Sequence, residues 1–282
     1  MFLQPKTLQE AAALLAAHGG TLVAGGTDVF PAQVDRAPPE TVIDLSHVAD
    51  LKGIRVAADH VRIAGGVTWS ELVAADLPPA FDALKAAARE IGSIQIQNRG
   101  TLAGNLCNAS PAADGVPPLL ALDAAVELTS RNGTRRLGLA EFILGNRRTA
   151  LQAGEILSAV LVSNVWNDAR TAFLKLGARR YLVISIVMVA ATIARRPDGS
   201  VRAARVAVGS ASAVARRLTA LEDRLVGAHD ATARLSSLIA ADDLAALAPI
   251  DDVRGSASYR IEAARELVGR AIDLAAGVVA DA

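Results

Sequence analysis

The segment IGSIQIQNRGTLAGNLCNASPAADGVPPLLALDA, from Ile91 to Ala124, is the stretch around which the rest of the chain is organised. Its first half is rich in glycine, asparagine and threonine, and a long apolar run follows at once. Glycine lets the main chain approach a ligand without an intervening Cβ atom, and outward-facing backbone N–H groups attract anions. The segment therefore predicts a turn that binds an anion such as a nucleotide diphosphate, with a plain glycine-rich surface turn as the alternative.

A second glycine segment, GGTLVAGGTDVFP, lies far upstream between Gly19 and Pro31. Within it, the apolar strand LVA (residues 22–24) directly precedes GGTD (residues 25–28), which is the arrangement of a phosphate-binding turn. A lone pair of glycines is more often an ordinary turn. Two such segments in one chain, however, indicate that a single ligand is held from both sides.

Composition narrows the class of protein. A chain of 282 residues can form one large domain or two ordinary ones. Its 29 basic and 29 acidic residues balance, which argues against nucleic acid or an anionic membrane as a partner. The single cysteine, Cys107, excludes a disulfide framework and an all-cysteine iron–sulfur or zinc site within the chain.

Two further features concern location. The N-terminal sequence MFLQPKTLQE lacks the basic-then-apolar pattern of a signal peptide, so we expect a cytoplasmic protein. The longest apolar run, from Tyr181 to Ala194, contains Ser185 and Thr192 and is shorter than the roughly 20 residues that span a bilayer. It predicts a buried core segment rather than a transmembrane one.

Local patterns predict the elements of the first part of the chain. Thr7 and Thr68 each stand three residues before a glutamate, the signature of a capped helix start. Apolar runs bounded by glycine or other turn residues indicate strands. The expected helices are residues 7–18, 68–75, 80–91 and 117–122, and the expected strands are residues 21–24, 41–45, 54–57, 61–64, 125–129, 134–139 and 156–162.

Beyond a boundary expected near residues 163–168, the pattern changes. Strands are predicted at residues 186–194 and 201–208, on either side of a Pro197-Asp198-Gly199 turn. Alanine- and leucine-rich stretches predict helices at residues 213–225, 231–247 and 259–279. The second part is therefore expected to be a small antiparallel sheet with helices.

Four ordered segments of the chain resemble one protein family. LVAGGTDV (Leu22 to Val29) and TLAGNLCNASPAAD (Thr101 to Asp114) are similar to the FAD-binding medium subunit of the molybdenum hydroxylases, the family of xanthine dehydrogenase and carbon monoxide dehydrogenase. PETVIDLSHVADLKGI (Pro39 to Ile54) and FLKLGARR (Phe173 to Arg180) resemble the same family, in the right order. The resemblance thus covers nearly the whole chain.

The resemblance implies an α+β fold. A two-subdomain FAD-binding domain of the vanillyl-alcohol-oxidase (PCMH-like) type would occupy residues 1–165, with subdomains at about 1–54 and 55–165. A C-terminal domain of antiparallel sheet and helices would occupy residues 166–282.

The resemblance also implies a set of residues that bind FAD non-covalently. The two glycine segments would contact the phosphates, and Asp114 would bind the cofactor, unless it only caps a helix before Pro117. Ile91 and Leu157 would contact the flavin or adenine, with plain core packing as the alternative. Lys175 would lie near the flavin, where a cation stabilises the reduced anionic ring, unless it is a solvated strand lysine, and Tyr181 would cover one ring face. The full set is Leu22, Val23, Ala24, Gly25, Gly26, Thr27, Asp28, Val29, Ile91, Thr101, Leu102, Ala103, Gly104, Asn105, Asp114, Leu157, Lys175 and Tyr181.

The sequence contains few residues that would indicate a metal site, a covalently linked flavin or a catalytic motif. His18, His47, His60 and His229 are scattered, so we expect no metal site, and the pattern argues against a histidine-linked flavin. The chain contains no nucleophile elbow, Walker lysine loop or G-x-G-x-x-G fingerprint. No residue is expected to be catalytic.

The function implied by the resemblance is electron transfer within a larger enzyme. A large subunit would carry molybdopterin and a small subunit two [2Fe-2S] clusters, in a heterotrimer or its dimer, and this chain would pass electrons to a final acceptor. The alternatives are a free-standing flavin reductase of the same fold, for which no substrate motif is found, and a cofactor-free assembly subunit, which both intact glycine segments oppose.

Overall fold

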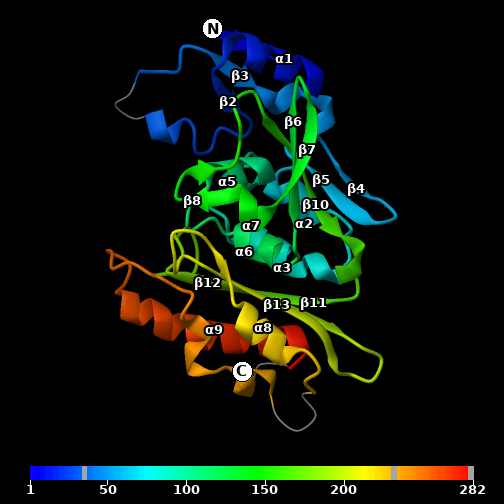
Figure 1. Ribbon diagram of the computed structural model, residues 1–282. Helices are drawn as coiled ribbons and strands as arrows, with labels where there is room; N and C mark the ends of the chain where they lie inside the picture. Colours follow the sequence, from blue (N-terminus) through cyan, green and yellow to red (C-terminus); the bar gives the residue numbers. More distant parts are fainter. Residues whose placement is uncertain (34–36, 230–233, 279–282) are drawn as a thin grey trace.

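The computed structural model describes residues 1–33, 37–229 and 234–278. Its three larger sheets follow one another along the molecule: a small N-terminal sheet, a central five-stranded sheet and a C-terminal four-stranded sheet (Figure 1). Helices pack between and around them. The predicted α+β class is therefore confirmed.

The N-terminal sheet is parallel, and its strands lie in the order β1 (Phe2–Leu3), β3 (Val42–Asp44) and β2 (Thr21–Val23). Helix α1 (Leu8–His18) connects β1 to β2, and the Thr7 hydroxyl accepts a hydrogen bond of 3.1 Å from the backbone N–H of Glu10. Ala11 and Ala12 on the helix and Ile43 on β3 are fully buried in one apolar cluster. The predicted helix and both predicted strands in this region are confirmed.

The central sheet is antiparallel throughout, with β10 in its middle because this late strand inserts between the earlier β5 and β6. The Thr68 and Glu71 side chains form the predicted capping box at the start of α2. The strands, in sheet order, are β4 (Ile54–Val56), β5 (His60–Ala64), β10 (Ile156–Ser163), β6 (Ala125–Ser130) and β7 (Gly133–Gly138). The other elements of this region are α2 (Trp69–Ala74), α3 (Asp82–Glu90), α4 (Ile94–Gln97), α5 (Leu102–Asn108), α6 (Val116–Leu120), α7 (Leu139–Phe142) and the ribbon β8 (Ile143–Gly145) with β9 (Arg148–Thr149).

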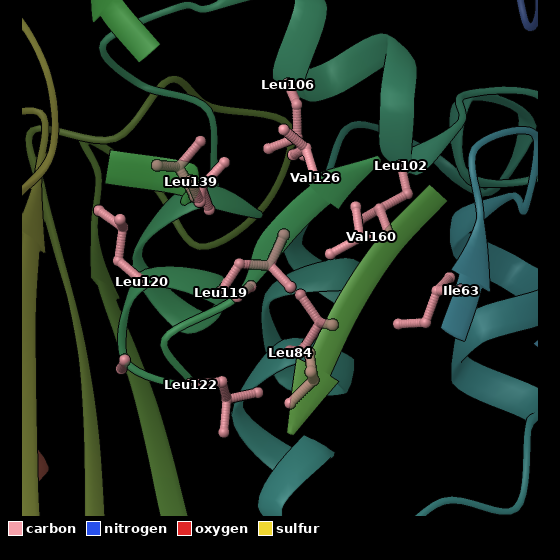
Figure 2. Packing of buried hydrophobic residues seen from close by; sticks show 14 of the residues in the cluster. Ile63, Leu84, Leu102, Leu106, Leu119, Leu120, Leu122, Val126, Leu139 and Val160 are labelled. Carbon is pink, nitrogen blue, oxygen red and sulfur yellow. The ribbon is translucent and has the colours of Figure 1, made fainter. Parts of the chain in front are cut away.

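The apolar core on this sheet determines which side of α5 is buried. Leu102 and Leu106, four residues apart on one side of the helix, point into the apolar cluster toward Val160 and Val126 of the sheet (Figure 2). Residues at this spacing share one helical face. Since the leucines hold that face against the core, the intervening residues of α5 are turned the other way, which matters for the site described below.

The C-terminal sheet is also antiparallel, in the order β11 (Arg170–Leu176), β12 (Val187–Arg195), β13 (Val201–Gly209) and β14 (Arg216–Arg217). Helix α9 (Ala257–Ala276) packs along β12 and β11, and α8 (Thr219–Leu225) packs on β13. Short 3-10 helices occupy Pro31–Gln33, Leu45–His47, Ala49–Leu51, Pro79–Phe81, Asn164–Trp166, Leu235–Leu238 and Ala241–Leu244.

Two sequence expectations in this part are wrong, and one strand was not predicted. Residues 213–218 are not helical, because Arg216 and Arg217 pair with β13 instead. In the described part of residues 231–247, two short 3-10 helices form instead of the expected α-helix. The Asp243 carboxylate accepts a hydrogen bond from the Ala240 N–H and pairs with Arg224, and such local side-chain bonds compete with helix formation. β11 has no counterpart among the predicted strand ranges. The expected helix at 259–279 exists as α9 and ends at Gly277, whose φ is 94°; residue 279 lies outside the described residues.

The sequence-based domain boundary at residues 165 and 166 falls in the 3-10 helix Asn164–Trp166, between β10 and β11. Across this boundary, Asp123 of the central region pairs with Arg205 at 2.9 Å and also with Arg217. Among the described residues, no helix is both long and apolar enough to cross a membrane.

Candidate functional site

The upstream glycine segment forms a tight bend after β2, which we call the glycine turn (residues 25–29). Gly26 has a φ of 72°, in the left-handed region that favours glycine. A Cβ atom on Gly25 would lie 1.9 Å from the carbonyl oxygen of Arg99, so only glycine fits there. Within the described residues, none of the backbone N–H groups from Gly25 to Val29 donates a hydrogen bond. The turn thus offers a row of unused donors, which is what an anion requires.

The downstream segment is a helix rather than the loop that the sequence predicted. Thr101 is the N-cap of α5, and its hydroxyl accepts a hydrogen bond of 3.1 Å from the Gly104 N–H. The N–H groups of Leu102 and Ala103 donate to the carbonyls of Val67 and Gly65. The first amides of α5 are therefore occupied within the protein, and this segment presents mainly side chains to its surroundings.

The two segments meet. The main chain of Gly25 lies against Arg99 and Gly100, and a Cβ atom on Gly100 would lie 3.4 Å from the Thr27 hydroxyl. At the other end of α5, the Asn108 side-chain amide donates to the Asp28 carboxylate at 2.9 Å. The glycine turn and α5 are thus two walls of one site, although 80 residues separate Asp28 from Asn108.

A cleft of about 450 Å³ lies between these walls, and mostly apolar residues line it. Thirteen of the eighteen predicted binding residues contribute to it: Leu22, Ala24, Gly25, Gly26, Thr27, Asp28, Val29, Ile91, Thr101, Ala103, Gly104, Asn105 and Leu157. Two others, Val23 and Leu102, are buried behind the walls. Leu102 belongs to the central core, because it lies on the core-facing side of α5.

Asp114 and Lys175 lie outside the lining of the cleft and bind one another. The Lys175 ammonium donates to the Asp114 carboxylate at 2.7 Å and to the Glu90 carbonyl at 3.2 Å, and the Ser185 hydroxyl donates to Asp114 at 2.7 Å. Both side chains are more than nine-tenths buried, so Lys175 is not a solvated strand lysine. Burial raises the pKa of Asp114, and Lys175 and Ser185 offset only part of that rise. The pair joins the central region to β11.

Tyr181 is 58% exposed and lies on the surface, outside the cleft. Its ring stacks under the Arg180 guanidinium, 5.2 Å from the ring centroid. In the same loop, Arg179 donates to the carbonyl of Leu182. Nothing in this arrangement places the Tyr181 ring over the cleft.

The cleft also contains residues outside the predicted set of eighteen. Trp69, at the start of α2, is 2% exposed, and its ring reaches from Gly100 to Gly115. The only sequence feature near Trp69 was the Thr68 cap, which predicts the start of the helix but not the direction in which the Trp69 ring points. Cys107 is half-buried, and desolvation raises the pKa of its thiol to about 12, which keeps it neutral. The remaining additions are Leu45, Ile96, Gly100, Asn108, Leu151, Glu155 and Ile156.

Comparison with known proteins identifies both parts of the chain. Residues 1–163 match the family described as the FAD binding domain in molybdopterin dehydrogenase, and residues 172–275 match the CO dehydrogenase flavoprotein C-terminal domain. The chain is 32% identical over 283 aligned positions to the nicotine 6-hydroxylase medium subunit of Paenarthrobacter nicotinovorans, covering 96% of this chain and 95% of that protein. It is 30% identical to the carbon monoxide dehydrogenase medium chain of Hydrogenophaga pseudoflava, with the same coverage.

Solved structures support the same family relationship. A chain of reconstituted CO dehydrogenase from Oligotropha carboxidovorans superposes with a TM-score of 0.89 at 27% identity, covering 99% of this chain and 98% of that one. The similarity therefore extends over both domains as well as the cleft. This chain belongs to the FAD-binding medium subunit family of the molybdopterin-dependent dehydrogenases and hydroxylases.

Proposed function

We propose that the chain binds FAD non-covalently in the cleft and transfers electrons within a molybdopterin-dependent hydroxylase or dehydrogenase complex. The observation that carries this proposal is the meeting of the glycine turn and α5 around one cleft, with the amides of the turn left unbonded among the described residues. Free N–H groups beside an apolar cleft suit a ligand with a diphosphate and two flat rings. The residues present thus fit the cofactor that defines the family.

Each wall would hold a different part of the cofactor. The amides from Gly25 to Val29 would bind the diphosphate, and the side chains of Asn105 and Asp28 would contact its phosphate and sugar oxygens. Ile91 and Leu157 supply apolar wall for the flat rings. Asp114 lies one residue before Gly115, whose missing side chain makes room for Trp69 in the cleft wall. We therefore keep the Asp114–Lys175 pair in the proposed site as a group beyond its lining, whereas Tyr181 is kept on the family resemblance alone, because it is exposed and does not line the cleft.

The proposal includes partner subunits. Relatives are named medium chains or medium subunits, a term that implies companions of other sizes. Cys107 is the single cysteine of the chain, so [2Fe-2S] clusters would be held by a small subunit and molybdopterin by a large one. A bound flavin can accept electrons one at a time and release them in pairs, which suits the last step of such a chain. Assembly as a heterotrimer or its dimer, and a cytoplasmic location, are parts of the same proposal.

Spectroscopy of the purified chain tests the proposal. The expected result is a flavin absorbance spectrum with close to one FAD per chain, released intact by acid because the link is non-covalent. Flavin reduction should require the reduced iron–sulfur subunit. Rapid reduction by NADH without any partner would indicate a free-standing reductase, and a chain that neither carries nor takes up FAD would indicate a cofactor-free assembly subunit.

A further inference from the structure

The backbone at Trp69 is fixed against the start of α5. Its N–H donates to the Gly100 carbonyl at 3.2 Å, and the capping box of Thr68 and Glu71 holds the first turn of α2 around it. Thr68 also forms an isolated β-bridge with Thr101, the N-cap of α5. Trp69 is therefore tied by its main chain to the wall of the cleft before any ligand binds.

The indole ring of Trp69 lies along this wall in a defined direction. A Cβ atom on Gly115 would lie 2.6 Å from Cη2 and 3.3 Å from Cζ2 of the ring, so the six-membered ring occupies space that Gly115 leaves free. A Cβ atom on Gly100 would lie 3.4 Å from Cδ1 of the ring and 3.4 Å from the Thr27 hydroxyl. The five-membered ring, in which Nε1 is bonded to Cδ1, therefore lies where the glycine turn meets the start of α5.

The indole N–H of Trp69 has no acceptor within the described part of the chain. Trp69 as a whole is only 2% exposed, yet its Nε1 is not fully enclosed by protein. Since Trp69 lines the cleft, the N–H is open to the cleft. A buried tryptophan N–H usually finds a hydrogen-bond partner, and a ligand in the cleft is the partner that this position leaves room for.

The charges around the cleft explain why a neutral donor matters there. Of the described residues that line the cleft, none is cationic, and the two with charged side chains are Asp28 and Glu155. Asp28 accepts from the Asn108 amide, and Arg135, outside the lining, binds Glu155 through two bonds of 2.6 and 2.9 Å. A ligand diphosphate would therefore be held by neutral N–H groups rather than by lysine or arginine. Each such donor then contributes a larger share of the affinity.

We propose that Trp69 is a further cofactor-binding residue, whose indole N–H donates a hydrogen bond to a diphosphate oxygen of FAD. This inference rests on the proposed function, because it requires FAD in the cleft. An indole N–H can only donate, so the group opposite it is an acceptor, and a bond to an anionic oxygen is stronger than one to a neutral oxygen. The diphosphate is the relevant part of FAD because the five-membered ring lies beside Thr27, in the turn whose amides would bind the same group.

Nuclear magnetic resonance of the full chain with isotope-labelled tryptophan tests the bond directly. The chain contains two tryptophans, so the spectrum holds two indole N–H signals, and Trp69→Phe identifies the one from Trp69. FAD should shift this signal downfield, and so should ADP, a probe that has the diphosphate but no flavin. Adenosine, which has no phosphate, should leave it in place. Trp166 is the internal control, because it is buried under Arg205 and outside the cleft lining; its signal should not move.

Ligand affinity is the second measurement. Trp69→Phe keeps an aromatic ring but removes the N–H, and it should weaken binding of FAD and of ADP about tenfold or more, as expected for the loss of a hydrogen bond to a charged group. Adenosine affinity should not change. Trp166→Phe is the matched control, because it makes the same substitution at a buried position outside the cleft lining; it should bind all three ligands as the wild type does.

A Trp69 signal that does not move with ADP or FAD would overturn the proposal, as would equal shifts with ADP and adenosine. Equal losses of ADP and adenosine affinity in Trp69→Phe would also overturn it, because they would indicate ring packing rather than a bond to phosphate. A wild-type chain that takes up no FAD would instead refute the proposed function. The two failures are distinguishable, because FAD bound with an unmoved Trp69 signal contradicts only the role of Trp69.

Discussion

The two walls of the cleft use the polypeptide in opposite ways. The glycine turn carries unbonded amides and has no room for a side chain at Gly25, whereas α5 has its first amides bonded and presents side chains. The turn can leave its amides free because it is a short bend, with the Phe30 N–H returning to the Gly26 carbonyl. In α5, by contrast, the N–H groups of Leu102 and Ala103 donate to the carbonyls of Val67 and Gly65, and the Gly104 N–H donates to the Thr101 hydroxyl. Two glycine-containing segments therefore line the cleft in different ways, the glycine turn with backbone amides and α5 with side chains.

This difference predicts that substitutions in the glycine turn affect both fold and cofactor. Gly25→Ala should have the largest effect, because its Cβ atom would overlap the Arg99 carbonyl, a backbone atom with little freedom to move. We expect loss of bound flavin together with a destabilisation of about 1–3 kcal/mol or more, the usual cost of overpacking. Flavin absorbance and thermal unfolding measure the two effects.

Gly145→Ala provides the control. A Cβ atom on Gly145 would meet only the Arg148 side chain, at 3.9 Å, which is an ordinary contact. This variant should keep its flavin and its melting temperature. Full flavin occupancy in Gly25→Ala would show that the two walls do not need to touch, and the comparison would fail.

The next largest effect separates cofactor from fold. Gly104 is exposed on the cleft side of α5, and a Cβ atom there would approach only the Thr101 hydroxyl, at 2.9 Å. Gly104→Val should abolish flavin retention, because the branched side chain occupies space that a phosphate oxygen needs. Stability should fall by no more than about 1 kcal/mol, the typical value of the Thr101 cap that the new Cβ atom crowds, since valine is otherwise no worse a helix former than glycine. Equilibrium unfolding without flavin and flavin content of the same preparation test this; retained flavin would contradict the assignment of α5 to the site.

Some strands and helix starts could be predicted from the sequence, because the residues that specify them are close together in the chain. β2 and β10 are short apolar runs bounded by turns, and the caps at Thr7 and Thr68 are encoded within four residues. α5 could not be predicted in this way. Its residues include glycine and two asparagines, which are poor helix formers, and the helix is stabilised by tertiary packing of its leucines.

The site could not be predicted from local patterns alone, because contacts between residues far apart in the sequence form it. The pairing of Lys175 with Asp114 joins positions 61 residues apart, and no local pattern distinguishes a buried lysine from a solvated one on a strand. Trp69 is similar, because the cap before it predicts a helix but not which side of that helix faces the cleft. The family resemblance located the two walls, and the structure added how each wall makes contact.

A smaller effect is expected at the cap of α5. Thr101→Ala removes the acceptor of the Gly104 N–H and should cost about 1 kcal/mol of stability, the typical value for loss of an N-cap. It should also weaken flavin binding, because the start of α5 would fray. Thr101→Ser keeps the hydroxyl and should restore both properties in chemical denaturation and flavin titration; equal losses in both variants would show that the methyl group, not the cap, matters.

The smallest effect concerns the direct side-chain bond from Asn108 to Asp28, which joins the two walls. If the turn and α5 hold the cofactor jointly, Asp28→Ala and Asn108→Ala should not be additive, because either change alone breaks the contact. A double-mutant cycle on flavin affinity should give a coupling energy of about 0.5–1 kcal/mol. A coupling energy of zero would mean that each wall binds its part of the cofactor independently, and the convergence of the two segments would then reflect packing rather than shared binding.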